Sequence, residues 1–209
     1  KMIVNSKVIG AMLILGPILT MGVWMVYSVD TSGMSPSDSM AAIIADVNKA
    51  KLSSILNVFG VMSMFTGLHL LARSLKSDNA VSNACAEIGG LFLVLLVPVW
   101  VIMMGSDISA LGAAQDFGVD VGVQILTAST MLQTSGILLV VGMFLLGISF
   151  ILLKKYKRII GILFVVTSGL AFMDMLFEPN TDIVGMIGWM GMFVITLVTG
   201  ILTTLQKDS

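Results

Sequence analysis

The stretch Lys154-Lys155-Tyr156-Lys157-Arg158 decides the fold, because it places four cations between two long apolar runs, 137–153 and 159–177. No other part of the sequence is as basic, and a stretch this short cannot form a domain. Short loops that are rich in Lys and Arg stay on the cytoplasmic side of a membrane. We therefore interpret Lys154, Lys155, Lys157 and Arg158 as a tight cytoplasmic turn between two membrane spans, which sets the direction of every other span.

The composition points to lipid as the main solvent of the protein surface. Of the 209 residues, 57% are hydrophobic and 11% are charged, whereas soluble domains have about 45–50% and about 25%. So few charged side chains cannot cover a surface in water. The sequence therefore predicts an all-α, polytopic integral membrane protein, a bundle of transmembrane helices. The net charge is −1 and points to no nucleic-acid partner.

Six apolar runs are long enough to cross about 30 Å of hydrocarbon at about 1.5 Å per residue. They are 8–27, 52–75, 81–104, 132–153, 159–177 and 183–205. The connections 28–51 and 105–131 are more polar, and we expect them to be outer loops. The first of these loops includes a short amphipathic helix, and the fourth helix begins somewhere between 120 and 132. The whole chain, 1–209, is expected to be one transmembrane domain of six helices.

Charged residues are sorted between alternate connections. Nine of the eleven cations lie in the connections 1–7, 73–79, 154–158 and 206–209. Eight of the twelve acidic residues lie in the opposite connections, where the only cations are Lys49 and Lys51. Because positive residues mark the inner side, this pattern predicts a multi-pass protein of the plasma membrane with both termini in the cytoplasm, N-in and C-in.

Three ionisable side chains are expected to come together near the turn between the second and third spans. His69 and Arg73 are i, i+4 neighbours on one helical face. Counting back from the turn puts Glu87 about level with His69. The cluster has a functional interpretation, as a proton relay or a site for an anionic headgroup. It also has a structural one, an Arg73–Glu87 ion pair that joins the two helices while Arg73 reaches water, and we favour this one.

A second candidate site is acidic. Asp174 lies about 22 Å from the inner end of the fifth span, at about 1.5 Å per residue. With Glu178, Asp182 and Asp107, which are expected in outer loops, it would offer the carboxylate oxygens that hard divalent cations prefer. The alternative, which we favour, is a solvated outer rim.

Other small and polar residues have structural interpretations. Gly185, Gly188 and Gly191 form a small-residue stripe in the sixth span, which allows close approach of a neighbouring helix. Asn57 and the hydroxyl residues near it are expected to hydrogen-bond between helices rather than to line a transport path. The seventeen methionines are spread through the spans, and we interpret them as flexible packing.

Several kinds of chemistry lack the residues they need. The sequence has one cysteine, Cys85, and one histidine, His69, so an intramolecular disulfide and metal sites built on several Cys or His are excluded. No Gly-rich phosphate loop follows a strand, and no serine has the context of a nucleophile elbow. We therefore expect no cofactor, no metal site and no enzymatic activity.

The layout resembles a family of bacterial and archaeal six-span membrane proteins that is known only as a domain of unknown function. The residues that carry the resemblance are the hairpin 40–75, the start Glu87-Ile88-Gly89-Gly90 of the third span, and the segment Lys157-Arg158-Ile159-Ile160-Gly161-Ile162-Leu163. The resemblance covers most of the chain as a pattern. It implies a fold and carries no activity with it.

Two classes of function remain open. The first is a non-catalytic accessory or structural subunit of a larger membrane complex, for example a membrane oxidoreductase, with other membrane subunits and the lipid bilayer as partners. The second is a small carrier, or a binding protein for a lipid or for a solute coupled to protons. This second class would use His69, Arg73 and Glu87, or Asp174. We favour the subunit.

Overall fold

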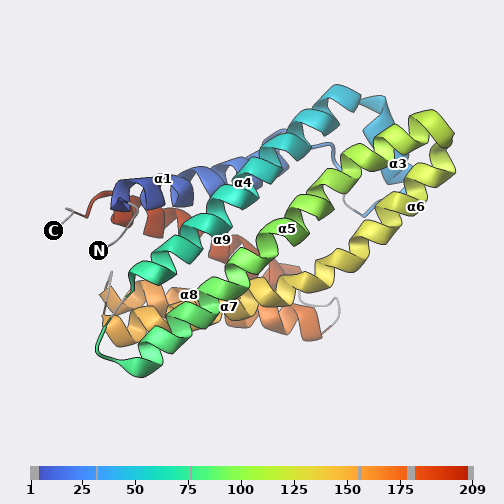
Figure 1. The fold of residues 1–209 in the computed structure, drawn as a ribbon. Helices are drawn as coiled ribbons and strands as arrows, with labels where there is room; N and C mark the ends of the chain where they lie inside the picture. Colours follow the sequence, from blue (N-terminus) through green and yellow to red (C-terminus); the bar gives the residue numbers. More distant parts are fainter. Residues whose placement is uncertain (1–4, 32, 76, 155–156, 178–181, 207–209) are drawn as a thin grey trace.

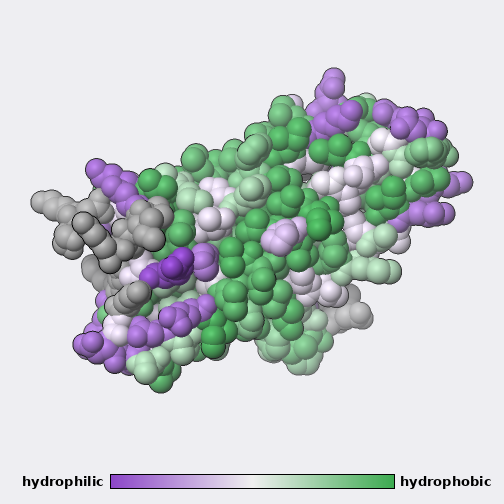
Figure 2. Space-filling view, viewed as in Figure 1, coloured by the Kyte–Doolittle hydropathy of each residue, from purple (hydrophilic) through white to green (hydrophobic). Residues whose placement is uncertain are grey.

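Six helices that are long and apolar enough to cross a membrane run through the part of the chain that the computed structural model describes, residues 5–31, 33–75, 77–154, 157–177 and 182–206. These six are Ser6–Val26, Val47–Ser74, Ala80–Phe117, Val119–Leu153, Arg158–Leu176 and Ile183–Thr204. On the face shown in Figure 2, an apolar belt separates hydrophilic groups at the two ends of the molecule. The predicted all-α polytopic membrane fold is confirmed.

Some of these spans are composed of several elements. In the first, α1 (Ser6–Pro17) continues beyond Pro17, which has no N–H to donate, as a π-helical segment (Ile18–Gly22) and then as α2 (Val23–Val26). The fourth combines α6 (Val119–Thr130), a 3₁₀ segment (Met131–Ser135) and α7 (Gly136–Leu153). The remaining helices are α3 (Pro36–Ala45), α4 (Val47–Ser74), α5 (Ala80–Phe117), α8 (Lys157–Leu176) and α9 (Asp182–Thr204).

The membrane helices form a closed ring. Each packs chiefly on its neighbours in the order α1, α4, α5, α7, α8, α9, and α9 packs back on α1. Gly10 near the start of α1 lies against Gly200 and Thr204 near the end of α9. The first helix therefore begins at the end of the bundle where the last helix finishes, as the N and C labels of Figure 1 indicate. This arrangement agrees with an even number of crossings.

Glycines allow the neighbouring helices of the ring to approach closely. At the α7–α8 contact, a Cβ atom added to Gly147 would lie 2.8 Å from the Gly161 carbonyl oxygen. One added to Gly161 would lie 2.7 Å from the Gly147 carbonyl oxygen. Gly89 and Gly142 face each other in the same way across the α5–α7 contact. Small residues that let backbones touch are the usual means of packing helices in lipid, where the hydrophobic effect does not drive helices together.

The stripe Gly185, Gly188 and Gly191 lies along the α8–α9 contact. A Cβ atom on Gly188 would lie 2.5 Å from the backbone nitrogen of Ala171, and one on Gly191 would lie 2.5 Å from the Thr167 methyl group. Gly185 lies beneath a side chain of α8 rather than beneath its backbone, a contact described with the site below. The stripe thus faces α8 along its length.

A second group of helices extends beyond the ring at one end. α5 has 38 residues, so it is about 57 Å long at about 1.5 Å per residue, nearly twice the ~30 Å of a hydrocarbon core. Its far end, the start of α4, and α3 and α6 pack around a second apolar core made of Met40, Ile43, Ala50, Ala110, Leu111 and Ala114. Figure 1 shows these segments projecting past the other helices. We call this part, residues 36–53 and 105–130, the lobe.

The lobe corrects our expectation for the two long connections. Both 28–51 and 105–131, expected as loops, are mostly helical, and the fourth helix begins at Val119, just before the expected range. Polar residues that appear loop-like in the sequence lie on the outside of the lobe, while apolar ones such as Met40 and Leu111 are fully buried between its helices. Gly118, with φ of 103°, makes the turn between α5 and α6, a conformation that favours glycine.

Candidate functional site

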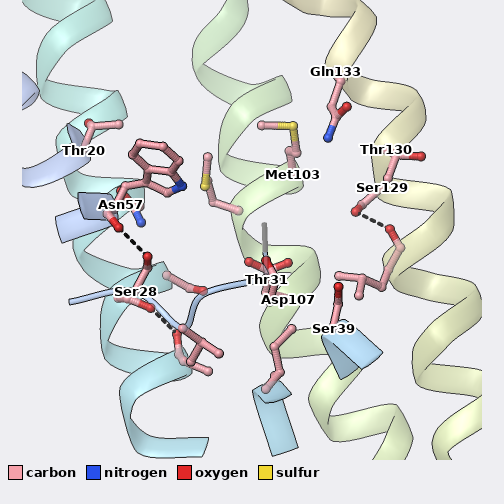
Figure 3. Close-up of a pocket in the computed structure, with 18 of the residues that line it drawn as sticks. Thr20, Ser28, Thr31, Ser39, Asn57, Met103, Asp107, Ser129, Thr130 and Gln133 are labelled. Carbon is pink, nitrogen blue, oxygen red and sulfur yellow. Dashed lines mark hydrogen bonds between the residues drawn. The ribbon is translucent and has the colours of Figure 1, made fainter. Parts of the chain in front are cut away.

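A cavity of about 960 Å³ lies where the lobe joins the ring. Its walls are formed by several residues between Thr20 and Thr31, by Met34 and Pro36, by the start of α4, the far half of α5, the end of α6 with the following 3₁₀ segment, and the start of α9. Sites for small molecules usually occupy about 300–1,000 Å³ and often lie between helices of a bundle. The cavity therefore has the size and position of a binding site (Figure 3).

Asp107 is the only ionisable residue among the cavity-lining residues that the structure describes. It lies on α5, and Figure 3 shows its carboxylate near the middle of the group of lining side chains. Ser54 on α4 lines the cavity as well. No Lys or Arg is among the described lining residues. The charge of the Asp107 carboxylate therefore has no partner of opposite sign within the cavity.

Two hydrogen-bonding groups in the wall have no partner. Asn57 on α4 is only 8% exposed, yet its amide makes no hydrogen bond with any other residue in the described part of the chain. The indole nitrogen of Trp100 is buried and, within the same residues, also has no acceptor. Buried polar groups are normally satisfied, so the Trp100 nitrogen marks a place where something other than protein completes the structure. The Asn57 amide lines the same cavity and is available to the same occupant.

Several hydroxyl groups of the cavity wall, unlike Asn57 and Trp100, have hydrogen-bond partners in the protein. They donate their single proton to a carbonyl oxygen about one turn earlier in the same helix. Thr20 donates to Gly16 at 2.9 Å, Ser53 to Ala50 at 3.0 Å. On α6, Thr127, Ser129 and Thr130 do the same at 2.7–2.8 Å. A hydroxyl whose proton is used in this way can only accept hydrogen bonds from other groups. The hydroxyls thus make the wall rich in acceptors.

Much of the rest of the wall consists of Trp and Met side chains. All three tryptophans of the sequence line the cavity, namely Trp24, Trp100 and Trp189. Six of the seventeen methionines do so too: Met21, Met34, Met103, Met104, Met186 and Met190. We interpreted the methionines as packing spread through the spans, and the structure instead brings several of them from different helices to one cavity. The phenyl ring of Phe65 packs edge-on against Trp100, with ring centroids 5.4 Å apart.

His69, Arg73 and Glu87 lie away from the cavity. The Nδ1–H of His69 donates to the Gly90 carbonyl oxygen at 3.0 Å, which joins α4 to α5. Arg73 and Glu87 are both exposed, and no ion pair joins them or any other pair of described residues. The structure therefore does not show the expected Arg73–Glu87 ion pair. Counting back from the turn put His69 about level with Glu87, and in the structure its ring contacts Gly90, three residues further along α5.

The structure places two of the four acidic candidates, Asp174 and Asp107. Asp174 on α8 accepts a hydrogen bond from the indole nitrogen of Trp189 at 3.0 Å, and its carboxylate lies over Gly185. Asp107 belongs to the cavity wall. Glu178 falls outside the described residues, as does the side chain of Asp182. Within the described part of the chain, no three His, Cys, Asp or Glu side chains come together as a metal site.

The basic turn lies only partly within the described residues. Lys154 ends α7 with φ of 55°, and Arg158 lies exposed in the first turn of α8. Lys155 and the side chain of Lys157 lie outside the described residues.

Sequence reasoning missed Asp107, Asn57 and Trp100 as parts of one site. One signal in the sequence pointed to this region. The segment 124–135 is too polar for contact with lipid, so its polar side chains must face either protein or water. Comparison with known proteins adds no assignment, because no protein-family model, no curated protein and no solved structure matches the chain.

Proposed function

We propose that this polytopic membrane protein binds a small amphipathic molecule in the cavity between the ring and the lobe. The observation that carries the proposal is a large cavity whose described wall includes two groups without a protein partner, the buried indole nitrogen of Trp100 and the amide of Asn57. Leaving such a group unsatisfied costs about 1–3 kcal/mol. A ligand with a polar head and an apolar body would satisfy them and cover the Trp and Met side chains. This keeps the binding-protein or carrier class that the sequence left open, with a different set of residues.

A cavity-filling substitution tests the proposal. Thr130 lines the cavity from α6, whereas Ala128, two residues earlier, is exposed and does not line it. All tryptophan fluorescence of the protein comes from the cavity wall. In detergent or nanodiscs, a bromoalkyl alcohol should therefore quench this fluorescence with a saturable curve. Thr130→Phe should weaken the binding about tenfold, equivalent to about 1.4 kcal/mol.

Ala128→Phe is the matched control and should leave the curve unchanged. Quenching that rises in proportion to the probe concentration in the wild-type protein would show simple partition into the membrane, and it would contradict a binding site. Equal effects of the two phenylalanines would also contradict the placement of the site.

An accessory subunit is the second candidate function. Phe117 and Val119, on either side of the Gly118 turn, are 76% and 48% exposed at the tip of the lobe, beyond the length that α5 needs to cross hydrocarbon. Exposed apolar residues in such a place favour a protein contact. A stoichiometric complex obtained by mild purification from native membranes, with the partners identified by mass spectrometry, would support this candidate. The resemblance to the six-span family of unknown function remains compatible with both.

The sorting of Lys and Arg supports a specific orientation, with both termini in the cytoplasm and the lobe on the outer side of the plasma membrane. A protease-sensitive tag at the C-terminus should then be cleaved only after the cells are permeabilised. Cleavage in intact cells would contradict the orientation, and it would leave the cavity proposal intact, because the cavity does not depend on which side the lobe occupies.

A further inference from the structure

We propose that the cavity selects an organic ammonium ion with an apolar body, and that the carboxylate of Asp107 is its counterion. This inference rests on the proposed binding function and names the chemical class of the ligand. Three independent properties of the cavity wall carry it: its charge, its hydrogen-bonding capacity and its aromatic surface.

The charge of the wall is negative. Asp107 is the only ionisable lining residue in the described part of the chain. A smaller adjoining pocket of about 330 Å³, which shares Trp24, Ser28 and Thr31 with the cavity, adds Asp30. Lys49 and Lys51 flank the lining residue Ala50 in the sequence, but they do not themselves line the cavity. A carboxylate in a partly dry site is stabilised by a cation beside it.

The hydrogen-bonding capacity of the wall also fits a cation. The hydroxyl protons of Thr20, Ser53 and the α6 residues are committed to backbone carbonyls, so these oxygens offer lone pairs to the cavity. An ammonium group has hydrogen-bond donors and no acceptor, which matches such a wall. A carboxylate or phosphate ligand would place its own lone pairs against these oxygens and against Asp107. The unpartnered indole N–H of Trp100 suits a neutral oxygen elsewhere on the ligand.

The aromatic and thioether surface favours an apolar cation over a hydrated one. A cation over the face of a Trp ring is attracted by the ring quadrupole, by about 0.5–2 kcal/mol, and three Trp side chains line this cavity. The methionines supply polarisable, adaptable contacts for hydrocarbon. A hard metal cation prefers several carboxylate oxygens, and the described wall has one carboxylate.

Three quenchers with the same bromoalkyl chain and different heads test the inference: an alkylammonium, an alcohol and a carboxylate. Each is titrated against the tryptophan fluorescence of the full chain in zwitterionic nanodiscs. The ammonium should bind at least about tenfold tighter than the alcohol, as expected for a charge-assisted hydrogen bond, and the carboxylate should bind most weakly. Asp107→Asn keeps the shape of the side chain and should bring the ammonium to the affinity of the alcohol.

Asp116→Asn is the matched control, because Asp116 carries the same charge on α5, is exposed and does not line the cavity. It should keep the preference for ammonium. An alcohol that binds the wild-type protein as tightly as the ammonium would overturn the inference while leaving the binding function in place. Equal losses for all three probes in Asp107→Asn would overturn it too, since they indicate a structural role. If no probe saturates, the proposed function itself fails. The comparison of probes on the wild-type protein remains decisive even if Asp107→Asn folds poorly.

Discussion

Replacing Gly161 with alanine should destabilise the ring by about 1–3 kcal/mol, as over-packing does, although alanine is the better helix former. The added Cβ would meet the Gly147 carbonyl oxygen at 2.7 Å and the backbone nitrogen of Ile151 at 2.8 Å. Neither atom belongs to a side chain that can rotate away, so α7 and α8 must separate. Unfolding in detergent, followed by tryptophan fluorescence or by the loss of the monodisperse peak on heating, measures the change.

Gly169→Ala is the control, in the same helix and with the same chemical change. Nothing lies within 4 Å of a Cβ atom at Gly169. The only remaining effect is the helix propensity of alanine, which should leave the stability unchanged or raise it by about 0.5–1 kcal/mol. If both variants lose stability equally, α8 does not approach α7 as closely as the two glycines indicate. A loss confined to Gly161→Ala supports the backbone contact.

Hydropathy was sufficient to predict the six spans, because one physical requirement, about 30 Å of hydrocarbon with every backbone group satisfied, acts on each of them. The glycine stripe of the last helix was also visible, since Gly185, Gly188 and Gly191 recur on one helical face. Which helix the stripe faces was not visible. α9 packs on both α8 and α1, and no local pattern tells which of these two neighbours the stripe faces.

The lobe and the cavity were missed for a related reason. Outside hydrocarbon, a helix needs only a narrow apolar stripe, so the segment 105–131 looked like a polar loop. Asn57 was expected to join two helices, because a polar group inside a span usually does. The structure instead turns its amide toward a cavity that forms only where the lobe meets α9 and the end of the first span. The residues were recognisable one by one, but their common site was not.

The two apolar cores should respond separately to the same substitution in the same helix. Leu111 and Leu93 are both fully buried on α5, Leu111 in the lobe core and Leu93 in the core of the ring. A Leu→Ala change in a well-packed core costs about 2–5 kcal/mol. Because a local opening draws on local contacts, Leu111→Ala should raise amide hydrogen exchange in α3 and α6 while α7, α8 and α9 keep their protection. Leu93→Ala should instead weaken the ring.

Binding should separate the two variants as well. The α6 residues Thr127, Ser129 and Thr130 line the cavity, and a loosened lobe no longer holds them in place. Leu111→Ala should therefore weaken quenching by the bromoalkyl probes even under conditions where the ring remains folded, and exchange mass spectrometry of the same samples identifies the helices that open. A uniform rise in exchange along the whole chain would mean that lobe and ring form one cooperative unit. The long, unbroken α5 would then transmit the loss from one core to the other, and the ligand would be bound by a rigid wall rather than by one that can open at the lobe.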